Sequence, residues 1–493
     1  MLISHDLGTS GNKASLHRAT GEPVASASAS YPTRHGQHSA EQDPHDWWRA
    51  VVDSTRELLA TTGTDPRHVT GICVAGQMMA AVLLDEHHEP VRPAMIWSDQ
   101  RATEQAAAIT AAVGAERAFA LTGHRVAANY TLPKLAWVRD HEPATFARAR
   151  HVCVTKDYVN LRLTGRLATD HSDASSTAAY DLHAGTWSTD LLDAVGLDRD
   201  LWPEVVPSTE VLGTLTRRAA DDLGLPPTVR VVAGGGDGPM ANVAAASLAP
   251  EDAGYVCLGT SAWYATTTTA PIADPQQRGF TFRHVVPGLF APCATTQAGA
   301  ASLSWFADAL GSGQTPAELA AEASGVRAGE DGLFFLPHLL GERTPWWNPD
   351  ASGTFAGLRP GHGRAHLARA VMEGVGLALA LCRDALADGD HERRPVSVIG
   401  GGANSDAWLQ VFADLWGVPV QRRAVTTEAT ALGAAVTGLV GLGEADFAAA
   451  RRLAPVTATF EPRPDVAVRG LLEQRYVGLY TALDGWFRAS GKA

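Results

Sequence analysis

A short segment near the start of the chain combines an acidic residue, glycines, hydroxyls and a lysine. Residues 6–13 read Asp-Leu-Gly-Thr-Ser-Gly-Asn-Lys and follow a short apolar run. A tight turn of this composition can lay backbone N–H groups and the hydroxyls of Thr9 and Ser10 along phosphate oxygens, while Asp6 faces a Mg²⁺ ion or its water. A plain hairpin turn has a similar composition, so the segment alone leaves both interpretations open.

The same pattern returns in the second half of the chain. Residues 255–264 read Tyr-Val-Cys-Leu-Gly-Thr-Ser-Ala-Trp-Tyr and repeat the strand, the Leu-Gly-Thr-Ser turn and the second strand of residues 3–16. Two such turns, one from each of two domains, can hold a polyphosphate from opposite sides. The repeat therefore favours Thr260 and Ser261 as phosphate donors.

Asp237 follows three glycines at the end of an apolar run, residues 231–237 reading Val-Val-Ala-Gly-Gly-Gly-Asp. Because the glycines carry no side chains, a substrate hydroxyl could approach the carboxylate to hydrogen-bonding distance. Phosphoryl transfer needs positioning, neutralisation of charge and an acceptor for the proton of the attacking hydroxyl. Asp237 suits that last role, although an Asp that caps the following helix would give the same pattern.

A third glycine-rich turn lies at residues 398–405, which read Val-Ile-Gly-Gly-Gly-Ala-Asn-Ser and precede a segment with helical character. Such a turn lets a flat ligand approach the backbone, and the N-terminus of the helix favours an anionic group. The chain contains neither a Walker motif nor a clear dinucleotide fingerprint.

The four segments described above, in these relative positions, resemble those of the FGGY family of carbohydrate kinases. Residues 353–358 and 366–373 resemble the C-terminal signature region of that family. Within the family the chain is most similar to the xylulokinases, and the resemblance covers essentially its whole length. The segments that carry this closer similarity are Glu41–Pro44, Ala75–Met78, Ile96–Arg101, Pro133–Leu135, Lys156–Tyr158, Phe335–Pro337 and Gly341–Pro345.

The resemblance implies an α/β fold with two ribonuclease-H-like domains of the actin, sugar kinase and chaperone type, and an interdomain cleft in which ATP meets the sugar. We place the N-terminal domain, with the sugar site and part of the phosphate site, at residues 1–247. The C-terminal domain, with the ATP site, is placed at residues 248–493.

The resemblance also implies roles for individual residues. Asp237 is the catalytic base, and Asp6 supports Mg²⁺ and the phosphates. The other residues expected to bind ATP are Gly8, Thr9, Ser10, Lys13, Gly259, Thr260, Ser261, Gly401, Gly402, Ala403 and Asn404. The residues expected to bind the sugar are Gln77, Met78, Met79, Asp99, Arg101 and Asp237.

Two positions depart from the pattern of the xylulokinases. Met79 stands where that group usually has a histidine that meets the sugar, and Gly238 stands where an asparagine commonly follows the catalytic Asp. Both replacements remove hydrogen-bonding groups, so they bear on which sugar is accepted and leave phosphoryl transfer intact.

The elements that must position these residues alternate between strands and helices, which is typical of the α/β class. The chain begins with an expected β-meander at residues 2–5, 13–17 and 23–31. A helix is then expected to start at Asp43, as N-cap, with Pro44 in its first turn.

Composition narrows the class of partner. The 493 residues suffice for two domains, and the formal net charge of −13, without a run of basic residues, argues against binding nucleic acid. Five scattered cysteines and the absence of a signal-peptide pattern favour a reducing cytoplasm, with no membrane partner. The longest uncharged run, residues 429–443, is too short to cross a bilayer and is expected to form a buried helix.

These observations predict an enzyme that transfers the γ-phosphoryl group of Mg²⁺-ATP to a ketopentose, D-xylulose first of all, and that can form a homodimer. Another pentulose, a hexulose, a polyol or a sugar acid is the alternative substrate. A chaperone-like ATPase and a non-catalytic sugar-sensing regulator are further alternatives, but retention of both Asp6 and Asp237 favours an enzyme.

Overall fold

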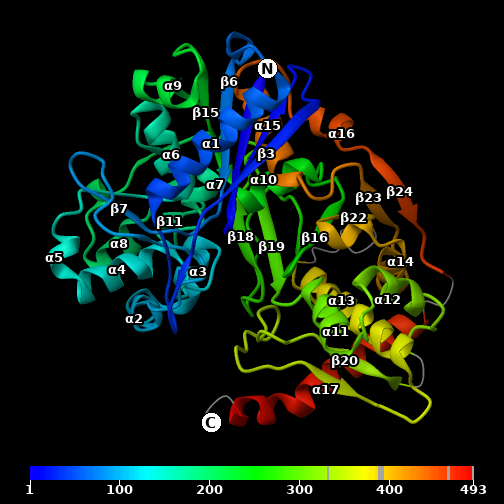
Figure 1. The fold of residues 1–493 in the computed structure, drawn as a ribbon. Helices are drawn as coiled ribbons and strands as arrows, with labels where there is room; N and C mark the ends of the chain where they lie inside the picture. Colours follow the sequence, from blue (N-terminus) through cyan, green and yellow to red (C-terminus); the bar gives the residue numbers. More distant parts are fainter. Residues whose placement is uncertain (330–331, 387–393, 464–466, 491–493) are drawn as a thin grey trace.

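The computed structural model describes residues 1–329, 332–386, 394–463 and 467–490, and it contains two large mixed sheets (Figure 1). The first sheet has the strand order β14-β15-β6-β1-β2-β3, and β1, β2 and β3 form the predicted antiparallel meander. Its strands are β1 (Leu2–Leu7), β2 (Gly11–His17), β3 (Pro23–Ser30), β6 (Gly71–Gly76), β14 (Val211–Thr214) and β15 (Arg230–Gly236). Because β6 runs parallel to both β1 and β15, the C-terminal ends of these three strands meet at one edge of the sheet.

One face of this sheet is covered by α1 (Pro44–Thr62) and α6 (Thr155–Thr164). The helix α1 begins as predicted, because the side chain of Asp43 accepts a hydrogen bond of 3.0 Å from the N–H of His45. Its apolar face, with Trp47 and Val51, packs into the same core as Ile3 on β1. A lobe of smaller helices, α2 (Thr103–Val113), α3 (Ala115–Thr122), α4 (Thr131–His141), α5 (Pro143–Phe146) and α8 (Thr189–Val195), lies beside this sheet (Figure 1).

The second sheet repeats the plan of the first. Its order is β18-β19-β17-β16-β22-β23-β24, and β16 pairs antiparallel with β17 and parallel with β22, as β1 does with β2 and β6. The strands are β16 (Gly254–Leu258), β17 (Ala262–Ala265), β18 (Phe280–Arg283), β19 (Phe290–Thr296), β22 (Val396–Ile399), β23 (Val420–Arg423) and β24 (Val456–Phe460). The α/β class and the construction of two halves on one plan are therefore confirmed, while the boundary at residue 247 stays a prediction.

The two halves share a core through two short helices. The predicted buried helix at 429–443 is present as α15 (Ala429–Gly441), which packs against β1, β6 and β15 and against α10 (Asp237–Ala244). Gly433 approaches α10 so closely that an added Cβ would lie 2.1 Å from the carbonyl oxygen of Met240. A larger residue at Gly433 would therefore push α15 away from the helix that carries Asp237.

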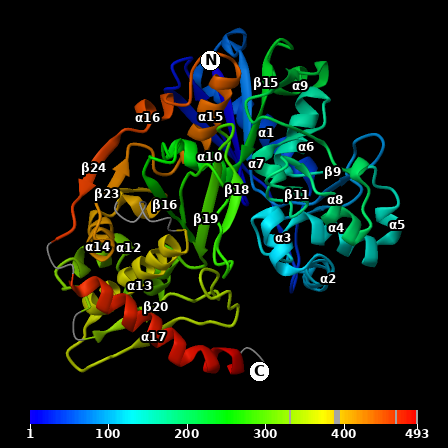
Figure 2. The ribbon, with the colours of Figure 1, turned by 180° about the vertical axis from the view of Figure 1, so that it is seen from behind.

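The helix α13 (Arg364–Ala385) is the one described helix that is long and apolar enough to cross a membrane, and 78% of its apolar window is buried. It packs against β17, β19 and α14 (Asp406–Trp416), as a core helix of a soluble protein does. In the view from behind, α17 (Ala467–Ser490) lies next to α13 and α14, both of which it contacts (Figure 2). All five cysteines are free thiols, as the sequence predicts.

Candidate active site between the two halves

Each of the two Gly-Thr-Ser turns is closed by a backbone hydrogen bond from its first glycine. In the first turn the N–H of Gly8 donates to the carbonyl of Gly11 at 3.0 Å, and in the second the N–H of Gly259 donates to the carbonyl of Ser261 at 3.1 Å. The first turn is held from outside, because the indole N–H of Trp97 donates to the hydroxyl of Thr9 at 2.8 Å. A preformed turn loses little conformational entropy when a ligand binds to it.

Two carboxylates face the space beside the first turn. Asp6 lies on β1 opposite Lys13 on β2, and Asp237 is the first residue of α10. Burial, followed by the nearby charge of Asp237, raises the pKa of Asp6 to about 7, with Lys13 opposing the shift. Burial also raises the pKa of Asp237 to about 6. A buried carboxylate whose charge is disfavoured by a neighbouring carboxylate, as that of Asp6 is by Asp237, suits a bound cation.

The carboxylate of Asp237 is not the N-cap of the helix that it begins. Gly236 holds that position, and the Oδ1 atom of Asp237 accepts the N–H of the next residue, Gly238, at 2.8 Å. The preceding glycines are needed for packing as well as for access. Gly234 has a positive φ of 72°, and an added Cβ would lie 1.8 Å from the carbonyl oxygen of Val74 on β6.

A cavity of about 220 Å³ opens beside Asp237, between the two halves of the chain. Thr9 and Ser261, one from each turn, lie in its wall together with the predicted sugar residues Met78 and Met79. The remaining lining residues are Trp97, Asn129, Gly238, Pro239, Asn242, Tyr255, Trp263, Ala265, Phe280, Phe282, Ala291, Cys293, Thr295 and Arg343. The cavity thus combines a carboxylate, hydroxyls and aromatic faces, as a sugar site requires.

Three residues expected to bind the sugar lie outside this lining. The side-chain amide of Gln77 is buried and donates to Gln42 at 2.7 Å. Asp99 is also buried and forms an ion pair of 2.7 Å with Arg101. Each of the three side chains already has a partner within the protein. Their direct contact with sugar stays a prediction.

Arg343 is a cavity residue to which the sequence pointed only through the Gly341–Pro345 segment. Its guanidinium makes no hydrogen bond or ion pair with any residue that the structure describes, and burial lowers its pKa. The loop that carries it is held by Glu342, whose carboxylate accepts from Thr296 at 2.7 Å and from the N–H of Gln297 at 3.1 Å. The cavity wall therefore presents a fixed cation whose donors are available to oxygen atoms of a ligand.

A second cavity, of about 800 Å³, lies beside the third glycine turn. Gly401, Gly402 and Asn404 line it, and so do side chains of α11 (Ala301–Leu310), α12 (Pro316–Ala323) and α14. Ala403 is fully buried behind the lining. Ala300, in the wall of this cavity, donates its N–H to the carbonyl of Gly259 at 2.7 Å, so the cavity adjoins the second Gly-Thr-Ser turn.

Lys13, expected at the phosphates, is half-buried and engaged across the two halves. Its ammonium lies 3.9 Å from the carboxylate of Glu428, the residue before α15. At that distance the pair is weak, so the Lys13 side chain can turn toward a phosphate at small cost.

Comparison with known proteins agrees with this geometry. The family model of the FGGY family of carbohydrate kinases, N-terminal domain, matches residues 1–244, and that of the C-terminal domain matches residues 254–442. The chain belongs to the FGGY family of carbohydrate kinases and is a phosphotransferase.

Three relatives illustrate the similarity. A xylulose kinase of Klebsiella pneumoniae is 38% identical, with 88% of this chain and 89% of that protein covered. The crystal structure of xylulose kinase from Rhodospirillum rubrum has a TM-score of 0.91 at 33% identity, with 99% of both chains covered. The crystal structure of gluconate kinase from Lactobacillus acidophilus has a TM-score of 0.92 at 26% identity, with 98% of both chains covered.

Proposed function

We propose that the protein is an ATP-dependent kinase that phosphorylates D-xylulose to D-xylulose 5-phosphate. The observation that carries the proposal is that Asp237, Thr9 of one turn and Ser261 of the other line the same cavity. Both turns belong to a chain whose relatives include xylulose kinases. The cavity of about 220 Å³ is of the size expected for a small, linear sugar rather than a polymer.

The chemistry follows from the placement of these groups. The acceptor hydroxyl, held beside Asp237, loses its proton to the carboxylate as it attacks the γ-phosphorus in line with the leaving ADP oxygen. The Gly-Thr-Ser turns supply N–H and hydroxyl donors to the phosphate oxygens, and the cavity beside Gly401 and Gly402 takes the adenosine. Closure of the two halves would exclude water that could otherwise hydrolyse ATP.

The residues present fit a Mg²⁺ ion that arrives with ATP. Within the described ranges no group of three or more His, Cys, Asp or Glu side chains is placed to hold a metal by itself. Mg²⁺ commonly takes only one or two carboxylates and completes its shell with phosphates and water, which matches Asp6 beside Asp237. Asp6 would hold the ion, which would neutralise charge on the phosphates when bound.

The sugar would be held at its other end by Arg343 and Asn129, whose side chains can donate to hydroxyl or carbonyl oxygens. Met79 and Gly238 leave an apolar stretch of wall between that end and Asp237.

The guanidinium of Arg343, which has no hydrogen-bond partner within the described part of the chain, favours a second candidate substrate, a sugar acid. A carboxylate would pair with it in a bidentate manner. The likeness to a gluconate kinase structure agrees with this candidate. We further propose that the enzyme works in the cytoplasm on small molecules, without nucleic acid or membrane, and that it can form a homodimer.

The proposal is tested by ADP release from Mg²⁺-ATP against pentuloses, hexuloses, polyols and sugar acids. Wild type should turn over D-xylulose, and Asp237→Ala should lower turnover by a factor on the order of 10² to 10⁴ with nearly unchanged ATP binding. Asp53→Ala, which removes an exposed carboxylate on α1, is the matched control and should behave as wild type. Near-normal turnover by Asp237→Ala would refute its role as base, and turnover of a sugar acid alone would favour the second candidate.

A further inference from the structure

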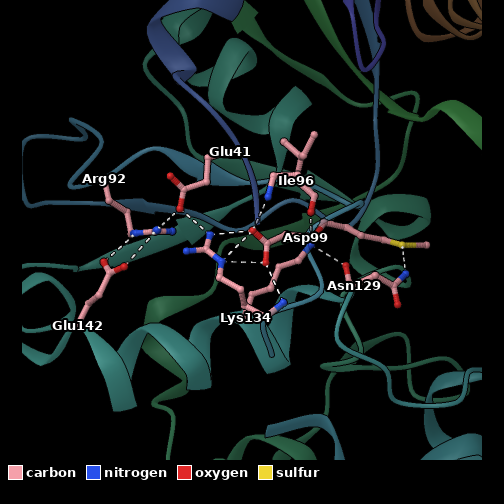
Figure 3. Close-up of polar contacts among 10 residues, drawn as sticks. Glu41, Arg92, Ile96, Asp99, Asn129, Lys134 and Glu142 are labelled. Carbon is pink, nitrogen blue, oxygen red and sulfur yellow. Dashed lines mark hydrogen bonds and ion pairs between the residues drawn. The ribbon is translucent and has the colours of Figure 1, made fainter. Parts of the chain in front are cut away.

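A lysine that the mechanism does not use lies behind the sugar cavity. Lys134, on α4, is fully buried, and its ammonium donates to the backbone carbonyl oxygens of Ile96 at 2.7 Å, Asn129 at 2.7 Å and Met79 at 3.0 Å (Figure 3). The three N–H groups of the ammonium are therefore each used by one carbonyl.

This arrangement is costly for the protein. Burial lowers the pKa of Lys134 to about 7, the charge of Asp99 opposes the shift, and that of Arg101 adds to it. Asp99 does not form an ion pair with Lys134, because its carboxylate is taken by Arg101 and by the N–H of Ala40. A buried ammonium with neutral acceptors and no carboxylate in contact is unfavourable for stability alone.

The three carbonyls belong to three segments that meet at the cavity. Met79 and Asn129 line it directly, and Ile96 precedes Trp97, which lines it and donates to Thr9. These segments are far apart in the sequence, and Lys134 joins them at one point.

Met79 depends most on this support. Its φ of 68° is unusual for a residue with a side chain, and such a conformation persists only where its surroundings enforce it. Three hydrogen bonds enforce it. The ammonium of Lys134 donates to the carbonyl of Met79, and the N–H of Met79 donates to the hydroxyl of Ser176 at 3.3 Å. The side-chain amide of Asn129 donates to the sulfur of Met79 at 3.2 Å.

We infer that Lys134 is a positioning residue of the sugar site, which sets the affinity for sugar by holding Met79, Trp97 and Asn129 in one wall without touching the sugar. The inference rests on the proposed function, because it assigns the cavity to the sugar. Its effect should fall on the sugar and not on ATP, whose adenosine cavity is lined by other elements.

The test compares the full-length protein with Lys134→Met, which keeps most of the length of the side chain and removes its donors. We expect KM for the sugar to rise about 10- to 100-fold, as a displacement near 1 Å in a site can cause, while KM for ATP stays within about twofold. Lys134→Gln, with two remaining N–H donors, should give a KM between those of Lys134→Met and wild type, and it carries the test if Lys134→Met does not fold.

Arg423→Met is the matched control, since Arg423 is a buried cation that donates to Ser397 at 3.1 Å and to the carbonyl of Ala454 at 2.8 Å, outside both cavities. It should lower the melting temperature without changing KM for the sugar. An unchanged KM for the sugar in folded Lys134→Met, or equal rises in both KM values, would overturn the inference. Absence of turnover in wild type would instead sink the proposed function, and with it the premise of the inference.

Discussion

Two fully buried lysines, Lys134 and Lys156, have opposite surroundings. The ammonium of Lys134 meets three carbonyl oxygens, whereas that of Lys156 meets the carboxylates of Asp157 at 2.7 Å, Asp170 at 3.1 Å and Asp173 at 3.3 Å. Burial lowers the pKa of both ammonium groups, but for Lys156 the three carboxylates outweigh burial and raise the pKa well above its usual value. Burial alone therefore does not determine the sign of such a shift; the charge of the partners does.

The two lysines also support different ends of the site. Asp170 accepts a hydrogen bond of 2.6 Å from the hydroxyl of Ser172, which in turn accepts the N–H of Gly236 at 3.0 Å. Gly236 immediately precedes Asp237. Lys156 and its three carboxylates are therefore linked to the proposed catalytic base, whereas Lys134 is linked to the wall of the proposed sugar cavity. The difference suggests that loss of Lys156 should act chiefly on stability, and loss of Lys134 on recognition.

The largest expected effect is that of Lys156→Met. Removal of the ammonium leaves buried carboxylates without their cation, which should cost about 3 to 5 kcal/mol in the free energy of unfolding. Lys134→Met leaves only neutral carbonyls unpaired and should cost about 1 to 3 kcal/mol. Urea denaturation of both variants at one pH near 7 measures the contrast. The raised pKa of Lys156 stabilises the folded protein fully below the unfolded pKa of about 10.4. The lowered pKa of Lys134 acts with the opposite sign, because it disfavours the folded state increasingly as pH falls from about 10.4 to about 7. If Lys134→Met lost as much free energy of unfolding as Lys156→Met, or more, the expected contrast between the two lysines would be wrong.

The pH dependence of activity extends the comparison to Asp237, a carboxylate whose raised pKa comes from burial and not from a lysine. Asp237 must be ionised to accept a proton, and its pKa of about 6 means that the base form is lost as pH falls below that value. We expect kcat/KM for the sugar to fall about tenfold per pH unit below about pH 6. A pH–rate profile that stays flat down to about pH 4.5 would show that the raised pKa does not govern catalysis.

The smallest expected effect is that of Ser172→Ala, which breaks the link between the Lys156 cluster and Gly236. Loss of the hydroxyl should cost about 1 kcal/mol in stability and lower kcat about three- to tenfold, with KM for the sugar changed less than in Lys134→Met. Steady-state kinetics beside thermal unfolding measure both quantities. The variant Thr61→Ala removes an exposed hydroxyl from α1, outside the lining of both cavities, and serves as a control for stability. A rise in KM for the sugar as large as that of Lys134→Met would show that Lys156 and Lys134 do not support different ends of the site.

Local sequence determined the elements that bear the phosphate turns. Gly8 and Gly259 close their turns through bonds between residues three or two positions apart, and Asp43 caps α1 through the N–H of His45. Such interactions depend on neighbours in the chain, so residue types and spacing predict them. The repeat of the turn likewise predicted two halves with one strand plan. The place of Asp237 after a glycine-rich strand suited a base, and that role stays a prediction.

Only the tertiary structure decided the wall of the proposed sugar cavity. Arg343, Asn129 and Met79 come from segments far apart in sequence, and no local pattern showed that they line one cavity. Nor did a local pattern show that Asp99 and Arg101 form an ion pair with each other. The hydrogen bonds from Lys134 to the carbonyls of Met79 and Asn129 were equally invisible in the sequence. The physical reason is that turns and helix caps are closed by hydrogen bonds between near neighbours, whereas a cavity and the burial of a charge are set by how distant segments pack.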